Sequence, residues 1–404
     1  MNYPVINVYG KIKNKCVTVR VPGSKSITAR AMLIAALANG ESTLYNAQLS
    51  DDCLTFLECL KNLGISCIVD GTTVKIEGCG GKVPVKSAKI NVGSAGTAAR
   101  FLTALLSFSD GEFIVDASEQ MKKRSMQPLI KALTAAGATI NTDGGTFPLK
   151  ICGTSNPNPH ITVDVTESSQ FVSALLICGV CAKNGVKLNT CGQHGLDYVN
   201  MTINMMWSFG VTVEEYNGSY KVSGEYSAKK YDIESDVSSA CYFYAANRIL
   251  GTQISVQGVM PHSMQGDLKF INLIKNFNGG TVDMSAFSDQ ALTLAAIAPY
   301  FDKPTHICGI SHIRGQESDR INAIRTNLSA MGVRCEEHAD GVTIYPSKPQ
   351  PAKIITFSDH RVAMAFAVTG LRADGIEIEN AQVCSKTFIN YFEELDRLCI
   401  ELTK

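Results

Sequence analysis

Residues 24–37 read SKSITARAMLIAAL, a short polar turn that leads into a long apolar run. The run is rich in Ala, Leu and Met, which are strong helix formers, and apolar residues would occupy nearly every face of the helix. Such a helix is expected to be buried. The Ser in front of it favours the N-cap position. The stretch therefore predicts a buried helix that begins at a capped polar turn, and it decides the fold because the pattern is repeated.

Six copies of this pattern occur along the chain, each with Ser, Thr or Asp in the polar turn as the expected N-cap. Their leading serines are Ser24, Ser94, Ser168, Ser238, Ser288 and Ser358. Amphipathic helices alternate with them, and the first five end at a glycine that precedes a hairpin. Because Gly adopts the left-handed conformation of a helix C-cap without strain, we expect a cap at each of these positions. The glycines are Gly64, Gly137, Gly210, Gly279 and Gly332.

Each repeat thus contains one buried helix, one amphipathic helix and several strands. Dividing 404 residues among six repeats leaves about 67 residues for each, too few for six independent cores. Three repeats per domain instead predict an α/β protein of two domains with a boundary near residue 233. The spacing shortens between the fourth and fifth repeats, where we expect a reduced unit.

The composition excludes several classes of protein. Lys plus Arg and Asp plus Glu each number 37, so the formal net charge is zero, whereas a protein that binds nucleic acid is usually basic. No segment reaches the roughly 18 consecutive apolar residues of a membrane span, and the first residues lack the pattern of a signal peptide. The 14 cysteines are scattered, many of them in apolar runs, which predicts reduced thiols in the cytoplasm. No His/Cys cluster has metal-ligand spacing, so we expect no metal.

The turns in front of the buried helices carry cations, which favours an anion-binding site. Each helix N-terminus has free N–H groups and roughly half a positive charge. Lys25 and Arg30 lie in the first turns of the first helix, where cations are unfavourable unless an anion is present. Gly93 and Gly96 in the second turn allow backbone N–H groups to approach a ligand closely. Six ordinary capped helices with solvated cations are the alternative interpretation.

Later turns add acidic residues that could transfer protons. Asp289 follows Ser288, and Glu317 lies in the segment QESDR. Two carboxylates in separate motifs can face opposite ends of a reacting system, one as a base and one as an acid. A helix cap is the alternative role for either residue.

Several short motifs, in one order along nearly the whole chain, resemble those of the enolpyruvyl transferase family. They are GSKSITARAMLIAALA, AGTAAR, SSQF, SMQGD, QESDR, SDHRVAMAFAV and SKTF. The resemblance implies a two-domain inside-out α/β fold, with three βαβαββ units in each domain, buried helices and strands outside. It also implies that residues 23–233 form one domain and that residues 1–22 and 234–404 form the other. The active site would lie in the cleft between them.

The branch of the family that the motifs resemble transfers the enolpyruvyl group of phosphoenolpyruvate to the 5-hydroxyl of shikimate 3-phosphate, a step of aromatic amino acid biosynthesis. By resemblance, Asp289 accepts the hydroxyl proton, and Glu317 and Lys25 exchange a proton with the phosphoenolpyruvate methylene carbon. The residues implied for phosphoenolpyruvate are Lys25, Gly96, Arg124, Gln170, Arg320, Arg361 and Lys386. Those implied for shikimate 3-phosphate are Lys25, Ser26, Arg30, Ser168, Ser169, Gln170, Tyr198, Asp289, His312 and Gln316. No cofactor, nucleic acid or membrane is implied, and we expect a cytoplasmic monomer.

At four positions the sequence departs from the family pattern. Gln316 stands where Lys is common, His312 and Ser94 each replace a common Asn, and Gly195 stands where Ser often contacts the shikimate phosphate. Most of these positions lie on the acceptor side, so other functions stay open. They are an enolpyruvyl transferase for another hydroxylated phosphate, the related enzyme for UDP-N-acetylglucosamine, and a non-catalytic anion-binding protein of the same fold. An RNA-modifying enzyme built from similar units is disfavoured by the zero net charge.

Overall fold

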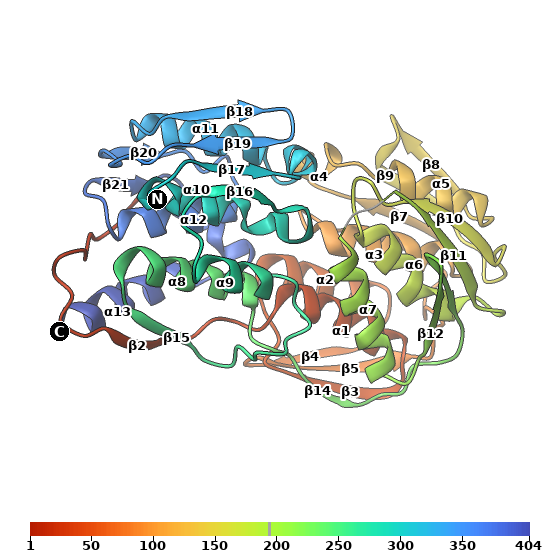
Figure 1. The fold of residues 1–404 in the computed structure, drawn as a ribbon. Helices are drawn as coiled ribbons and strands as arrows, with labels where there is room; N and C mark the ends of the chain where they lie inside the picture. The colour runs from red at the N-terminus through yellow and green to blue at the C-terminus, as the bar shows by residue number, and fades with distance from the viewer. Residues whose placement is uncertain (193–194) are drawn as a thin grey trace. The chain divides into compact units, whose positions relative to one another are not determined.

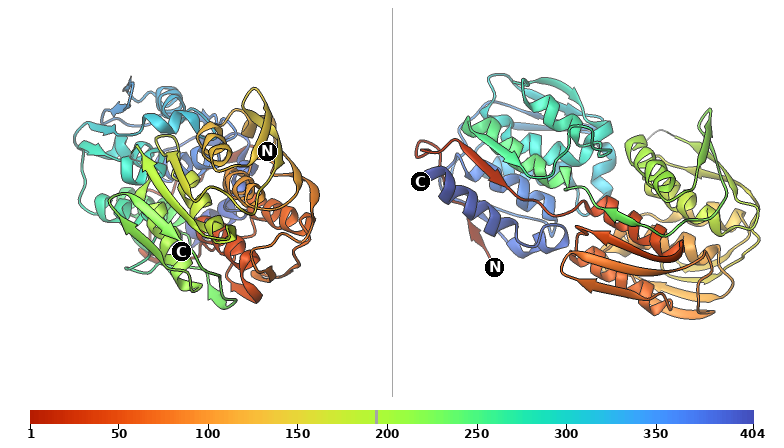
Figure 2. Two further views of the ribbon diagram at one scale, coloured as in Figure 1. Left: turned by 90° about the vertical axis from the view of Figure 1, so that its right-hand side faces the viewer. Right: turned by 90° about the horizontal axis from the view of Figure 1, so that it is seen from below.

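The computed structural model describes residues 1–192 and 195–404. Contacts between Cα atoms divide the chain into two compact units. We call Gly23–Ile233 the inserted unit and Met1–Pro22 together with Glu234–Lys404 the terminal unit. Both chain ends belong to the terminal unit, where α13 (Tyr391–Thr403) packs against β2 (Cys16–Val19), as Figure 2 shows.

The described residues of the inserted unit form three four-stranded sheets with one common strand order. The orders are β14-β3-β5-β4, β6-β7-β9-β8 and β10-β11-β13-β12. In each sheet the first pair is parallel and the other two pairs are antiparallel. The strands are β3 (Asn39–Tyr45), β4 (Cys67–Asp70), β5 (Thr73–Cys79), β6 (Ser87–Asn91), β7 (Glu112–Asp116), β8 (Thr139–Asp143), β9 (Thr146–Cys152), β10 (His160–Asp164), β11 (Val186–Cys191), β12 (Val213–Tyr216), β13 (Ser219–Val222) and β14 (Lys230–Asp232). The sequence repeat is therefore also a structural repeat (Figure 1).

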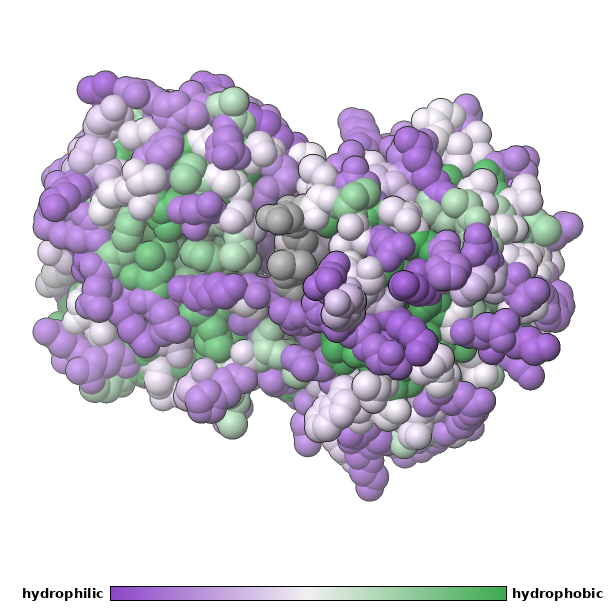
Figure 3. Space-filling model, turned by 45° about the vertical axis from the view of Figure 1, so that its right-hand side comes forward, coloured by the Kyte–Doolittle hydropathy of each residue, from purple (hydrophilic) through white to green (hydrophobic). Residues whose placement is uncertain are grey.

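Three apolar helices form the interior of the inserted unit. Its helices are α1 (Lys25–Leu37), α2 (Asp51–Asn62), α3 (Gly96–Ser107), α4 (Glu119–Lys122), α5 (Gln127–Ala135), α6 (Gln170–Cys178), η1 (Gly179–Cys181) and α7 (Leu196–Ser208). Nearly all residues of α1, α3 and α6 are buried, and α3 packs against both α1 and α6. Strands such as β10 instead alternate exposed and buried residues. The prediction that the apolar helices are buried is confirmed, and hydrophilic residues cover most of the face drawn in Figure 3.

The terminal unit repeats the same plan less completely. Its described residues form the sheet β16-β17-β19-β18, which has the full order, and the smaller sheets β1-β21-β20 and β15-β2. The two-stranded sheet belongs to the fourth repeat, where the shortened spacing predicted a reduced unit. The remaining strands are β1 (Tyr3–Pro4), β15 (Gln253–Val256), β16 (Gly280–Asp283), β17 (Thr305–Cys308), β18 (Cys335–His338), β19 (Gly341–Ile344), β20 (Ala352–Ile354) and β21 (Ile376–Ile378).

The other helical elements of the terminal unit are α8 (Val237–Leu250), α9 (Leu268–Ile274), η2 (Ser285–Gln290), α10 (Ala291–Ile297), η3 (Ala298–Tyr300), η4 (Ser311–Gly315), α11 (Arg320–Ala330), α12 (His360–Gly370) and η5 (Ala381–Lys386). Among them α8, α10 and α12 are the apolar helices of the repeat. Both α8 and α10 pack against α12. Most residues of α8, α10 and α12 are buried, as are those of α1, α3 and α6.

Four of the five predicted C-caps are present. Gly64, Gly137, Gly210 and Gly332 follow the ends of α2, α5, α7 and α11 with positive φ angles. After α2, the Ile65 N–H donates to the Leu60 carbonyl at 3.1 Å, the hydrogen bond of a Schellman motif. The prediction for Gly279 is wrong, because α9 ends at Ile274 and Gly279 lies in the following turn.

The N-caps of the six apolar helices are less uniform than the sequence predicts. Ser24, Asp236 and Asp359 accept hydrogen bonds from the first turns of α1, α8 and α12. At α3, α6 and α10 the cap position is Ala95, Ser169 or Gln290, and no side-chain hydrogen bond caps the helix. At α6 the predicted Ser168, one residue before the cap position, still accepts the first N–H of the helix, that of Gln170, at 3.2 Å.

Candidate functional site

The first helix of the inserted unit presents Lys25 and Arg30 from successive turns. Lys25 is the first residue of α1, and its Nζ lies 3.3 Å from Asp52 Oδ2 on α2. Ser26 lies beside it, and its carbonyl accepts a hydrogen bond from Arg30 Nη1 at 2.9 Å. One helix end thus positions the three predicted side chains Lys25, Ser26 and Arg30.

Arg30 is almost completely buried, with an exposed fraction of 2%, and its neighbours are neutral. Its Nε donates to Thr202 Oγ1 at 2.8 Å, and its Nη2 donates to Ser173 Oγ at 3.2 Å. Nη2 also lies 3.4 Å from the Tyr198 carbonyl. Within the described part of the chain, no carboxylate pairs with this guanidinium. Burial lowers the pKa of Arg30 to about 10, so the group still carries its charge at neutral pH.

The start of α3 lies against two arginines. A Cβ added to Gly96 would lie 2.6 Å from Nη1 of Arg124 and equally close to Nη1 of Arg100. Only glycine therefore leaves room for both guanidinium groups at this helix end. Arg100 is held by the carbonyls of Gly96 and Ser125, at 3.0 and 3.2 Å. Backbone N–H groups and two cations meet here, which is the chemistry of an anion site.

The start of α6 lies beside the start of α3. Gln170 Nε2 lies 3.4 Å from Thr97 Oγ1 on α3, and Gln170 Oε1 is buried with no hydrogen-bond partner among the described residues. Ser168 Oγ accepts from the Gln170 N–H at 3.2 Å. Ser169 is buried, and its hydroxyl lies 2.5 Å from the position that a Cβ on Gly195 would take. A buried amide oxygen without a hydrogen bond lowers the stability of the fold, and a donor group of a ligand would remove this cost.

Tyr198 on α7 completes this side of the inserted unit. The Arg30 guanidinium carbon lies 5.8 Å from the centre of the Tyr198 ring, within the range of a cation–π contact. Every residue that the sequence predicted between 23 and 233 thus lies at or next to the N-termini of α1, α3, α6 and α7. The residues Gln193 and His194, which precede Gly195, are outside the described part of the chain.

The terminal unit is organised around the buried Arg320, the first residue of α11. Its Nε lies 2.9 Å from Asp359 Oδ2, its Nη1 lies 3.0 Å from Asp289 Oδ1, and its Nη2 lies 2.8 Å from Glu317 Oε2. Burial alone would lower the pKa of this guanidinium, but the charges of the three carboxylates raise it above its ordinary value. Arg320 therefore fixes the two predicted proton-transfer groups, Asp289 and Glu317, relative to each other.

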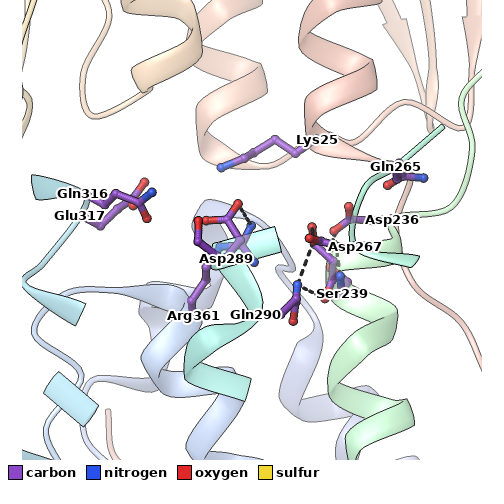
Figure 4. Close-up of polar contacts among 12 residues, drawn as sticks. Lys25, Asp236, Ser239, Gln265, Asp267, Asp289, Gln290, Gln316, Glu317 and Arg361 are labelled. Atoms are coloured by element: carbon purple, nitrogen blue, oxygen red, sulfur yellow. Dashed lines mark hydrogen bonds and ion pairs between the residues drawn. The ribbon is translucent and has the colours of Figure 1, made fainter. Parts of the chain in front are cut away.

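Two further cations complete the cluster. Arg361 Nη2 lies 3.0 Å from Asp289 Oδ2, and Figure 4 shows the Arg361 side chain directed at that carboxylate. Lys386 Nζ lies 3.7 Å from Glu317 Oε1. With Arg320 and Asp359, three cations and three carboxylates form one network in which Asp289 keeps 21% of its side chain exposed. Both proton-transfer groups are thus ion-paired and only partly covered.

The two predicted acceptor-side residues that depart from the family pattern also lie here. Gln316 Oε1 accepts from Arg320 Nη1, and Figure 4 shows Gln316 beside Glu317. His312 Nε2 lies 2.8 Å from Ser288 Oγ, the residue before Asp289. The structure thus brings all the predicted residues of the terminal unit into one group.

Sequence reasoning missed the residues that support this group. Asp267 is buried, accepts hydrogen bonds from Ser238 Oγ and, at 2.9 Å, from Gln290 Nε2, and so fixes the residue after Asp289 (Figure 4). Burial and the nearby charge of Asp289 raise the pKa of Asp267 to about 6. The motif SMQGD contains Asp267 and signalled its importance, but nothing in the sequence reveals its distant partners.

The described residues hold no group of three or more His, Cys, Asp or Glu side chains placed to bind a metal ion. They also include no helix of sufficient length and apolarity to span a membrane.

Comparisons with known proteins show which family the chain belongs to. The sequence model of the family described as EPSP synthase (3-phosphoshikimate 1-carboxyvinyltransferase) matches residues 11–279 and 273–395. A 3-phosphoshikimate 1-carboxyvinyltransferase from a Nostoc species is 39% identical, over 93% of this chain and 95% of its own. A second relative, 3-phosphoshikimate 1-carboxyvinyltransferase 2 from Halalkalibacterium halodurans, is 36% identical over 95% and 92%. An EPSP synthase structure from Acinetobacter baumannii superposes with a TM-score of 0.81 over 98% of both chains at 23% identity, which supports the fold.

Proposed function

The chain belongs to the EPSP synthase family, and we propose that the side chains of its two units act together on one pair of substrates. The reaction of this family transfers the enolpyruvyl group of phosphoenolpyruvate to the 5-hydroxyl of shikimate 3-phosphate and releases phosphate. The relatives are named for this acceptor, so it is favoured over the other hydroxylated acceptors that the sequence left open.

The inserted unit would hold the anions. Arg124 and the N–H groups around Gly96 fit a phosphate or carboxylate of phosphoenolpyruvate, because guanidinium groups form paired hydrogen bonds with such anions. Arg30, Ser26 and the Ser168–Gln170 turn would bind the phosphate and hydroxyls of shikimate 3-phosphate. Support comes from the buried Arg30, whose neutral partners leave its charge uncompensated. Two anions repel each other, so several cations are needed to hold both.

The terminal unit would move the protons. Asp289 would accept the proton of the 5-hydroxyl as the oxygen attacks the vinyl carbon, and Glu317 would deliver a proton to the methylene carbon. In the second step the departing phosphate takes the proton held by Asp289, and Glu317 takes a proton back from the new methyl group, so both carboxyl groups return to their starting states. Lys25 is the alternative donor for part of this transfer. The single observation that carries these roles is that the Arg320 guanidinium pairs with both Asp289 and Glu317 through different nitrogen atoms. The two carboxylates are thereby held at separate positions, as an acid and a base require.

The cations beside these carboxylates have a second role in this scheme. Arg361 and Lys386 would also receive the phosphoenolpyruvate phosphate and carboxylate, so their ion pairs with Asp289 and Glu317 would loosen when the substrate binds. Exchanging one anionic partner for another keeps each cation neutralised throughout. Asp289 and Glu317 would then lose their pairs with Arg361 and Lys386 at the moment when they are needed as base and acid, while Arg320 still holds both.

We also propose that the protein acts as a monomer in a reducing compartment. Within the described residues no two cysteines are joined by a disulfide bond, which supports a reducing compartment such as the cytoplasm. Sedimentation of the purified protein across a range of concentrations would reveal a stable oligomer and so contradict the first point.

The experiment that tests the function is an acceptor-dependence assay. Purified protein should release phosphate from phosphoenolpyruvate only when shikimate 3-phosphate is present. Parallel reactions with shikimate, with UDP-N-acetylglucosamine and with no acceptor serve as controls. Turnover with one of these acceptors and none with shikimate 3-phosphate would reject the assignment.

A further inference from the structure

The loop that carries Glu317 is anchored to the outer sheet of its unit at both ends. This loop, residues 309–319, connects β17 to α11 and includes η4 and Gln316. The hairpin of β18 and β19 lies beside it, and Asp340 occupies the hairpin turn. None of the motifs that signalled the function includes this hairpin.

The first end of the loop is fixed by Asp340. The carboxylate of Asp340 accepts the N–H of Ser311 at 2.7 Å and the N–H of Gly309 at 3.0 Å. The Asp340 carbonyl accepts the N–H of Ile310 at 3.2 Å. Three successive backbone N–H groups of the loop are therefore bound by one hairpin residue.

The second end is fixed by Arg314. Its Nη1 lies 2.8 Å from Glu337 Oε1 on β18, and its Nη2 donates to the His338 carbonyl at 2.9 Å. The same Nη1 lies 3.0 Å from Asp319 Oδ2. Asp319 in turn caps α11 by accepting the N–H of Asn322 at 3.0 Å. Arg314 and Asp319 flank Glu317 in sequence, so this guanidinium fastens the backbone on both sides of that carboxylate to the hairpin.

We propose that Arg314 and Asp340 are positioning residues for Glu317. Neither residue belongs to the ion network around Arg320, so their action on the reaction runs through the loop backbone. A proton-transfer carboxylate has to lie within hydrogen-bond reach of the atom that it serves, and a displacement of about 1 Å can cost a large factor in rate. The inference rests on the role proposed above for Glu317.

A double-mutant cycle between Arg314→Ala and Glu317→Gln tests the proposal. The Arg314→Ala variant should lower kcat about 10-fold, with smaller changes in KM for either substrate. In the Glu317→Gln background the same change should have almost no further effect on kcat, because the group that Arg314 positions is already lost. Equal kcat losses in both backgrounds, or an unchanged kcat in Arg314→Ala, would overturn the proposal.

Matched controls separate positioning from charge and from general damage. Arg334→Ala removes an exposed arginine that pairs with Glu336 next to the same hairpin, and Arg325→Ala removes the other partner of Glu337. Both should keep kcat within about twofold, because neither contacts the loop. Arg314→Lys keeps the charge but lacks the planar guanidinium that contacts Asp319, Glu337 and the His338 carbonyl together. It should therefore recover only part of the lost kcat. Full recovery by Lys would show that charge alone matters and would reject the anchoring role.

Two results keep the inference distinct from the function on which it rests. If Arg314→Ala does not fold, the double-mutant cycle can be made with Asp340→Asn, which acts on the other end of the loop. Asp340→Asn should lower kcat in the parent protein and have almost no further effect on kcat in the Glu317→Gln background. If Glu317→Gln itself has an unchanged kcat, the proposed role of Glu317 fails, and the positioning role fails with it. A normal loss in Glu317→Gln with no loss in Arg314→Ala rejects only the positioning role.

Discussion

Arg30 and Arg320 are the two largest fully buried side chains among the described residues, and their surroundings are opposite. Arg30 in the inserted unit is held by hydroxyl and carbonyl groups. Arg320 in the terminal unit is held by three carboxylates. A buried cation with neutral partners is suited to receive an external anion, whereas a cation with carboxylate partners orients those carboxylates. We therefore propose that the same residue type near a helix start serves binding in one unit and proton transfer in the other.

The largest expected difference concerns the free energy of unfolding. Arg320→Met would leave Asp359, Asp289 and Glu317 without their shared cation, which should cost about 3–5 kcal/mol. Arg30→Met should cost only about 1 kcal/mol, because Thr202 and Ser173 already share a hydrogen bond at 2.9 Å. Urea denaturation of both variants measures the two values. Equal losses of unfolding free energy would contradict the proposed difference between an arginine with neutral partners and an arginine with carboxylate partners.

A smaller effect is expected from Gly96→Ala. The added methyl group would displace Arg124 and Arg100 from the start of α3, and the KM for phosphoenolpyruvate should rise about 10-fold. The KM for shikimate 3-phosphate is the internal control and should change far less. Steady-state kinetics with each substrate varied in turn provides the test. A larger change for shikimate 3-phosphate would place the wrong substrate at this helix end.

The smallest expected effect is a pH dependence of the free energy of unfolding, which arises from Asp267 in the terminal unit. Asp267 has a folded-state pKa of about 6, above its ordinary value of 3.8, so binding a proton stabilises the fold. This contribution is complete below the unfolded pKa and is lost as the pH rises through about 6. Because Asn cannot titrate, the free energy of unfolding of Asp267→Asn should improve relative to that of the parent protein as the pH rises.

Denaturation at about pH 4.5 and about pH 7.5 provides the comparison. Asp289 and Arg361 face Asp267, so both must stay unchanged in the variant that is measured. A difference between variant and parent that is constant with pH would contradict the raised pKa of Asp267.

Local chemistry explains which parts of this structure could be predicted. Gly64, Gly137, Gly210 and Gly332 cap their helices because a single residue type satisfies a local geometry. The buried helices followed from composition alone. The cap at Gly279 failed because α9 ends earlier than its apolar pattern suggests.

The partners of the functional side chains could not be predicted in the same way. Arg320 bonds Asp289 and Asp359, which lie 31 and 39 residues away in sequence. Asp267 bonds Gln290 across 23 residues. Such contacts depend on how the repeats pack, so a single sequence indicates the residues but not their pairing.

The most direct test of the division between the units is the affinity for shikimate 3-phosphate in two variants. Isothermal titration calorimetry with Asp289→Asn should give a Kd within about threefold of the parent protein, although its kcat falls about 10²- to 10⁴-fold. Arg30→Lys should raise the Kd at least about 10-fold, since Lys cannot reproduce the planar fork. The reverse result, with binding lost in Asp289→Asn and kept in Arg30→Lys, would contradict the account.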